Sequence, residues 1–194
     1  VHDDGGKWFK NLFKVDKVWN MPAYPSRLTC EKVLDKEKGW SVELMLAYNR
    51  YGSGNYLSDA EPETLVATQW ALFSADVMGK YDFNKLYDLN ALMFGEKEIF
   101  QPFGTFGFGY TYRSMPRFPN TVTFNLGLGF NVWIYEGWGA QIQSLSKFGL
   151  KAGFPTSGSN YLQHSIGVVY KFQPKPTALG KRYKTKKASI RKTL

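Results

Sequence analysis

Six charged residues lie in stretches where polar and apolar residues alternate, and each falls on the polar parity of its stretch: Arg27, Glu31, Glu43, Asp76, Lys80 and Arg113. Successive side chains of a strand point to opposite faces, so all six would project from the polar face of a sheet. An isolated charge removed from water is costly, and we therefore expect an interior network of ion pairs and hydrogen bonds. The alternative is a gated pore lined by the same charges.

Residues suited to nucleophilic catalysis or metal binding are sparse. The chain contains one cysteine, Cys30, and two histidines, His2 and His164. A nucleophilic site needs a base and a group that orients it, and no such set is visible. Acidic residues at positions 3–4 and 59–63 offer oxygen ligands for a hard cation, but solvated loops explain them better. We predict no enzymatic activity, no metal site and no cofactor.

The elements that would position the six charges are strands. We predict seven of them, at residues 26–34, 39–50, 68–83, 99–114, 120–134, 138–150 and 160–172. The strongest signal lies between Val122 and Ile134, where every second residue is apolar and the intervening positions are mainly Thr, Asn and Gly. A soluble barrel with a ligand cavity would usually place apolar residues on its inner face, so this pattern favours a membrane barrel with a polar interior.

Composition and connections agree with an antiparallel, up-and-down transmembrane β-barrel. No stretch approaches the roughly 18 apolar residues of a membrane-spanning helix, and the mean hydropathy is −0.36. Aromatic residues make up 17% of the chain, which is expected where aromatic girdles border a lipid-facing band. Tight turns alternate with longer loops, except at residues 84–98, where a short helix is expected at 86–93.

The chain is expected to supply an eight-stranded barrel with a tail. Bacterial single-chain barrels have an even number of strands. Either residues 7–15 form a poor first strand, or the first strand lies upstream of Val1, which we favour. The expected organisation is an N-terminal segment or outer loop at 1–25, the barrel at 26–172 and a basic periplasmic tail at 173–194.

The net charge of +9 is concentrated in the tail. Residues 173–194 carry a charge of +8 without any acidic residue, which leaves the remainder of the chain at +1. Three interpretations remain: a solvated extension, a nucleic-acid-binding segment, and a segment that docks to a periplasmic protein, peptidoglycan or anionic lipid. A periplasmic location argues against nucleic acid. The candidate docking residues are Lys181, Arg182, Lys184, Lys186, Lys187, Arg191 and Lys192.

Several motifs resemble the eight-stranded OmpA-like outer-membrane barrels of Bacteroidetes, particularly the flavobacterial ones. The matching segments, in their order and spacing, are Trp-Asn-Met-Pro-Ala-Tyr-Pro-Ser-Arg at 19–27, Gly-Trp-Ser-Val-Glu at 39–43, Gly-Lys-Tyr-Asp-Phe-Asn-Lys-Leu at 79–86, Gln-Pro-Phe at 101–103, Asn-Leu-Gly-Leu-Gly-Phe at 125–130 and Ser-Asn-Tyr-Leu-Gln-His-Ser at 159–165. The resemblance covers about residues 1–172 and implies an outer-membrane location. Members usually continue into acidic calcium-binding repeats and a peptidoglycan-binding domain, whereas this chain has the basic tail.

The last predicted strand also resembles the signal read by the machinery that assembles outer-membrane barrels. The residues that carry this resemblance are Ser165, Gly167, Tyr170 and Phe172. The expected function is a non-enzymatic barrel with a side-chain-plugged lumen. It would act among lipid and other outer-membrane or periplasmic proteins as a structural or accessory subunit, for example in barrel assembly or type IX secretion. The alternative is a stand-alone envelope-integrity protein or a narrow porin.

Overall fold

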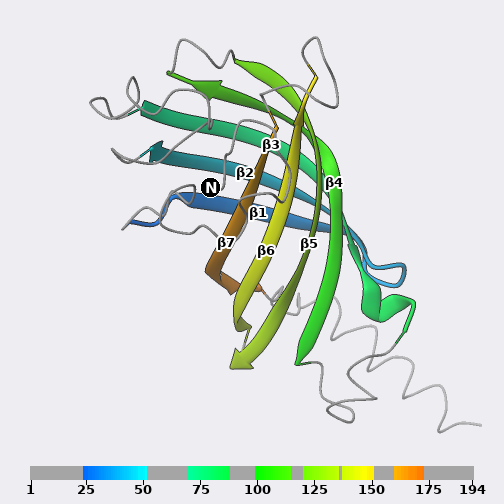
Figure 1. Ribbon diagram of the computed structural model, residues 1–194. Helices are drawn as coiled ribbons and strands as arrows, with labels where there is room; N and C mark the ends of the chain where they lie inside the picture. Colours follow the sequence, from blue (N-terminus) through cyan, green and yellow to red (C-terminus); the bar gives the residue numbers. More distant parts are fainter. Residues whose placement is uncertain are drawn as a thin grey trace, which may run out of the picture.

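A computed structural model describes residues 24–51, 70–87, 99–114, 120–135, 137–150 and 160–172 of the chain. This part forms one antiparallel sheet of seven strands and one short 3-10 helix (Figure 1). The elements are β1 (Arg27–Asp35), β2 (Trp40–Tyr51), β3 (Trp70–Asp82), η1 (Phe83–Lys85), β4 (Phe100–Arg113), β5 (Thr121–Tyr135), β6 (Trp138–Gly149) and β7 (Tyr161–Tyr170).

The sheet follows the order of the chain and curls into a half-barrel (Figure 1). Each strand pairs with its neighbours in sequence, and within the described residues β1 and β7 are each paired along one side only. The predicted all-β, antiparallel, up-and-down topology is therefore confirmed, and the predicted strand boundaries agree with the observed ones within about two residues. The eighth strand stays a prediction, because residues 7–15 lie outside the described part.

The half-barrel has two different ends, and two glycines shape one of them. Gly39 and Gly137 have φ angles of 78° and 88° in the turns that join β1 to β2 and β5 to β6. This left-handed conformation is unfavourable for residues with a Cβ atom, so glycine permits the close turns. The Asp35 carboxylate accepts hydrogen bonds from the backbone N–H groups of Glu37 and Lys38 at 3.0 and 2.9 Å. We call the end of the half-barrel that carries these two turns the tight-turn end, and the opposite end the loop end.

The connection after β3 starts with η1 rather than with the helix predicted at 86–93. The Asp82 carboxylate caps η1 by accepting a hydrogen bond from the Asn84 backbone N–H at 2.9 Å. Leu86 and Tyr87 lie in a turn beyond η1, and the rest of the predicted helix lies outside the described residues. Among the residues that the structure describes, no helix is long and apolar enough to span a membrane.

The two faces of the sheet differ sharply. On β2, Ser41, Glu43 and Met45 are buried on the concave, inner face, and Leu44 and Leu46 are exposed on the outer face. The same alternation continues along β3, β4 and β5 with the parity that the sequence predicts. The inner face is thus largely polar and buried, whereas the outer face is apolar and exposed.

Candidate functional site

The inner face of the half-barrel carries two groups of ion pairs. The first ion cluster consists of Arg27, Glu31, Glu43 and Lys80. The Arg27 guanidinium lies 2.8 Å from Glu43 Oε1. Lys80 Nζ lies 2.6 Å from Glu31 Oε2 and 3.7 Å from Glu43 Oε2, so Lys80 joins both carboxylates. These four predicted residues therefore meet in one chain of charges that begins at the edge strand β1.

Arg27 also links the first ion cluster to the opposite side of the half-barrel. Its guanidinium donates hydrogen bonds to Gln143 Oε1 on β6 and to Ser165 Oγ on β7. Within the cluster, the Ser41 hydroxyl donates to Glu31 Oε1 at 2.6 Å. The cluster consequently joins β1, β2 and β3 to β6 and β7 through side chains, although these two groups of strands share no backbone pairing.

The second ion cluster consists of Asp76, Lys147, Ser74 and Asn125. Lys147 Nζ donates to Asp76 Oδ2 at 2.6 Å and to Ser74 Oγ at 3.0 Å. Asn125 Nδ2 donates to the other carboxylate oxygen of Asp76 at 2.8 Å. The side chains of Asp76 and Lys147 are both 0% exposed. This pair of β3 and β6 is thus the most deeply buried charge pair among the described residues.

Lys147 was not among the predicted network residues, although a signal for it exists. Gln141 and Gln143 occupy the polar parity of the same strand, and the parity continues through Leu145 to Lys147. All four residues are buried on the inner face. Extending the alternation along the whole of β6 would therefore have identified the lysine, but not its partner on β3.

Arg113 lies on the inner face as predicted, but beside an aromatic ring. Its guanidinium carbon lies 4.8 Å from the centre of the Tyr161 ring, and Lys147 Nζ lies 5.6 Å from the same centre. The Tyr161 hydroxyl is 2.9 Å from Thr111 Oγ1. A cation over a ring is attracted by the negative face of the π system. Tyr161 thus connects β7 to Arg113 and Thr111 of β4.

An apolar layer separates the two ion clusters. It consists of Met45, Met78 and Leu145, of which none is more than 1% exposed. Met78 and Leu145 each lie between polar inward residues of their own strand, so that Met78 stands between Asp76 and Lys80. The interior consequently has a polar layer, an apolar layer and a second polar layer.

Inward glycines leave the space that these side chains fill. A Cβ atom on Gly109 would lie 1.9 Å from Asp76 Oδ1, and one on Gly129 would lie 2.6 Å from Cζ of Phe103. Phe103 is completely buried, and Lys80 Nζ lies 3.9 Å from the centre of its ring. The interior side chains therefore pack against backbone as well as against one another.

The outer face has an apolar band bordered by aromatic residues at both ends. In mid-strand, the exposed row Cys30, Leu44, Val77 and Phe108 is aligned by the strand registers. At the tight-turn end the Trp40 and Tyr81 rings lie 4.7 Å apart, and the Trp138 and Tyr170 rings lie 4.8 Å apart. At the loop end the register aligns three exposed aromatic side chains, those of Tyr48, Phe73 and Tyr112.

The residues of the proposed assembly signal lie on β7 and just beyond it. Ser165 points inward and accepts the hydrogen bond from Arg27. The Tyr170 ring lies 4.9 Å from the Phe172 ring on the outer side. A Cβ atom on Gly167 would have no neighbour within 4 Å, so crowding does not explain this glycine. The candidate docking residues of the tail lie outside the described residues.

The described residues offer no conventional catalytic or metal centre. They contain no group of three or more His, Cys, Asp or Glu side chains that could hold a metal ion. Cys30 is exposed on the outer face, and His164 is half-buried on the outward parity of β7. Comparisons of the chain with protein-family models, with curated proteins and with solved structures gave no match. Its function is therefore inferred from the two faces of the sheet.

Proposed function

We propose that this protein is a non-enzymatic, OmpA-like outer-membrane β-barrel of the Bacteroidetes type, with a lumen filled by its own side chains. One observation carries the proposal: the buried inner face is polar and ion-paired, and the exposed outer face is apolar. Transmembrane barrels alternate in this way, with aromatic girdles at both borders of the lipid-facing band. A soluble protein with this sheet would leave its largest apolar surface in water, which is unfavourable.

Strand length supports the same proposal. The described strands contain between 9 and 15 residues, and a tilted strand needs about 9–11 residues to cross the hydrocarbon core. The tight-turn end would face the periplasm, because periplasmic turns are the short ones in such barrels. An eighth strand, formed by residues 7–15 or by a preceding segment, would close the sheet between β1 and β7.

The membrane proposal is tested by adding a charge to two exposed leucines. Leu44 is 53% exposed in the middle of the outer band, and Leu86 is 61% exposed beyond the aromatic border. In phospholipid vesicles, Leu44→Arg should lower the free energy of unfolding by about 2–4 kcal/mol, because arginine at the bilayer midplane is costly. Leu86→Arg should be almost neutral. Urea unfolding followed by tryptophan fluorescence measures both.

A soluble fold would give the opposite result. Both leucines would then face water, and the two substitutions would have similar, small effects. Retention of the wild-type protein in the aqueous phase after mixing with vesicles would also contradict the proposal.

The filled lumen leads to a separate prediction about ion conductance. An eight-stranded barrel is just wide enough for side chains to fill it, and the two ion clusters and the apolar layer occupy the inner face. We expect negligible conductance in planar bilayers. Large and stable single-channel currents would instead support the narrow-porin alternative.

We further propose that the barrel is an accessory subunit of an outer-membrane or periplasmic complex, such as one for barrel assembly or type IX secretion. The support is the tail, whose charge of +8 contrasts with a nearly neutral body. Affinity purification from native membranes in mild detergent, with and without residues 173–194, tests this. Partners should be recovered with the complete chain and lost with the shortened one. Recovery of the complete chain alone would favour a stand-alone envelope protein.

A further inference from the structure

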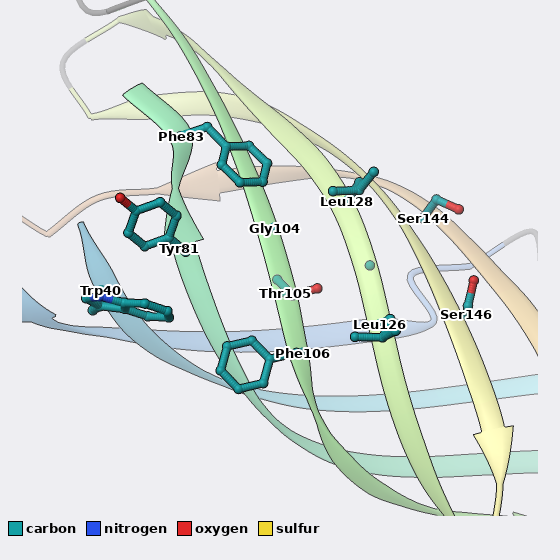
Figure 2. Close-up of a pocket in the computed structure, with 11 residues that line it drawn as sticks. Trp40, Tyr81, Phe83, Gly104, Thr105, Phe106, Leu126, Leu128, Ser144 and Ser146 are labelled. Carbon is teal, nitrogen blue, oxygen red and sulfur yellow. The ribbon is translucent and has the colours of Figure 1, made fainter. Parts of the chain in front are cut away.

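The outer face is interrupted by a hollow of about 610 Å³ that extends from β2 to β6 (Figure 2). Aromatic side chains border it near the tight-turn end, and leucines of β5 and two serines of β6 border it farther along. We call it the outer groove. Its walls include Trp40, Tyr81, Phe83, Phe106, Leu126 and Leu128. It is a concave site within the surface that we assign to lipid.

Glycines fix the aromatic walls of the outer groove. A Cβ atom on Gly104 would lie 2.9 Å from Cζ of Phe83, and one on Gly79 would lie 3.0 Å from Cζ of Phe106. The two rings therefore lie directly over glycine backbone, an arrangement that protects the strand and restricts the ring. These walls are preformed, so binding of a ligand need not order them first.

Small polar residues form the far end of the outer groove. Ser144 and Ser146 occupy outward positions of β6, opposite Leu128 and Leu126 of β5. Figure 2 shows both serine side chains on the side of the hollow opposite Trp40. In the described part of the chain, no side-chain hydrogen bond is made by either hydroxyl. Their small side chains leave this end of the outer groove open.

The length of the outer groove matches one leaflet of a bilayer. The register aligns Trp40 with Tyr81, Gly104, Leu128 and Ser144 across five strands. Neighbouring strands lie about 4.8 Å apart, so this row is about 19 Å long. The hydrocarbon of one leaflet is about 15 Å thick, half of a core of about 30 Å. An acyl chain lying obliquely across the strands would fit this length.

A lysine lies close in sequence to the aromatic walls, because Lys85 ends the short helix η1 that begins with the wall residue Phe83. A Cβ atom on Gly39 would lie 2.6 Å from Cγ of Lys85, so the lysine stem packs against the residue before Trp40. Lys85 is exposed, and no ion pair of its ammonium is found within the described part of the chain. Asp82 accepts hydrogen bonds from Asn84 and Gln101, and Asp35 accepts them from its own turn. The Lys85 ammonium is therefore available to an anionic headgroup at the membrane border.

We propose that the outer groove binds one acyl chain of an anionic phospholipid, whose phosphate lies near Lys85. This inference rests on the proposed membrane location. Aromatic walls hold the chain by packing, and the small side chains of Ser144 and Ser146 leave room for its far end. The lysine adds a preference for negative headgroups.

The test uses native mass spectrometry of the full chain in mild detergent with added phosphatidylglycerol. Ser144→Phe fills the outer groove and should weaken binding of the first lipid by about tenfold, because the lipid loses several buried methylene contacts. Ala140→Phe is the matched control, since Ala140 lies on the same strand and outward parity but does not border the groove. It should leave binding unchanged. Lys85→Gln should weaken phosphatidylglycerol binding severalfold and leave phosphatidylcholine binding unchanged.

Equal lipid binding by Ser144→Phe and the wild type would overturn the inference. The inference would also be overturned if native mass spectrometry showed a dimer for the wild type and Ala140→Phe but not for Ser144→Phe. The outer groove would then bind a second copy of the chain. The Leu44→Arg experiment separates this failure from failure of the membrane proposal. A barrel that is sensitive to Leu44→Arg but binds lipid without regard to Ser144 would lose only the groove assignment.

Discussion

The two ion clusters of the inner face differ in how they are protected. Asp76 and Lys147 of the second ion cluster are both 0% exposed and are joined by one short contact. In the first ion cluster, Glu31 lies on the edge strand β1 with its side chain 34% exposed, and Lys80 has a second carboxylate within 4.0 Å. The second cluster thus contains one ion pair, whereas the first contains three ion pairs that share Glu43 and Lys80.

This difference affects what the removal of one group does. Removing the partner of a buried charge leaves the desolvation cost of that charge uncompensated. An exposed charge is still solvated by water, and a doubly paired charge keeps its second partner. The clusters should therefore respond unequally to substitutions that look similar in sequence. The second cluster acts as a buried link between β3 and β6, and the first as an adaptable network near the edge of the sheet.

The largest effect is expected from Lys147→Met. Methionine removes the ammonium and leaves the buried Asp76 carboxylate with Asn125 and Ser74 as its side-chain hydrogen-bond donors among the described residues. The free energy of unfolding in phospholipid vesicles should fall by about 3–5 kcal/mol, as for other broken buried pairs. Urea unfolding followed by tryptophan fluorescence measures this change.

Asp76→Asn combined with Lys147→Met provides the control for that variant. The double variant has neither charge, so it should be more stable than Lys147→Met alone, because removing both partners avoids an unpaired ion. If the double variant were the less stable one, the link would depend on shape rather than on charge. If Lys147→Met does not fold, a folded double variant would still establish the charge effect.

An intermediate effect is expected from Glu43→Gln in the first ion cluster. Glu43 contacts both Arg27 and Lys80, at 2.8 and 3.7 Å. Each cation keeps other partners, namely Gln143 and Ser165 for Arg27 and Glu31 for Lys80. A loss of about 2 kcal/mol is expected, the usual range for a hydrogen bond to a charged group. A loss as large as that of Lys147→Met would remove the proposed distinction between the clusters.

The smallest effect is expected from Glu31→Gln. Glu31 is partly exposed, and Lys80 would retain Glu43 as a partner. Exposed ion pairs contribute up to about 1 kcal/mol and weaken in salt. The stability difference from wild type should therefore shrink further between low and high salt. A large effect that is independent of salt would show that closure of the barrel buries Glu31.

The strands and the faces were predictable because both follow from local alternation. A period of two along β5 is enough to assign Val122 and Leu126 to the outer face and Thr123 and Asn125 to the inner one. Neighbouring strands pair in sequence order, as in an up-and-down antiparallel sheet. The fold class thus depends on information within each strand and its turn.

The interior contacts were predictable only in part, because they join strands that are distant in the sheet. Asp76 and Lys147 meet across the concavity from β3 and β6, and Arg27 reaches β6 and β7. Such meetings depend on the curvature and stagger of the sheet, which alternation does not specify. Parity therefore placed Arg113 on the inner face correctly but could not indicate that Tyr161 lies beside it.

Cys30 is a natural labelling site in the middle of the apolar band. It is the single thiol of the chain, it is exposed on β1, and its register partner is Leu44. A fluorophore or spin label attached there would report the polarity and oxygen access of its surroundings without any further engineering. Such a label would therefore test the proposed membrane location, because it measures how far the middle of the strand lies from water when the protein is mixed with vesicles.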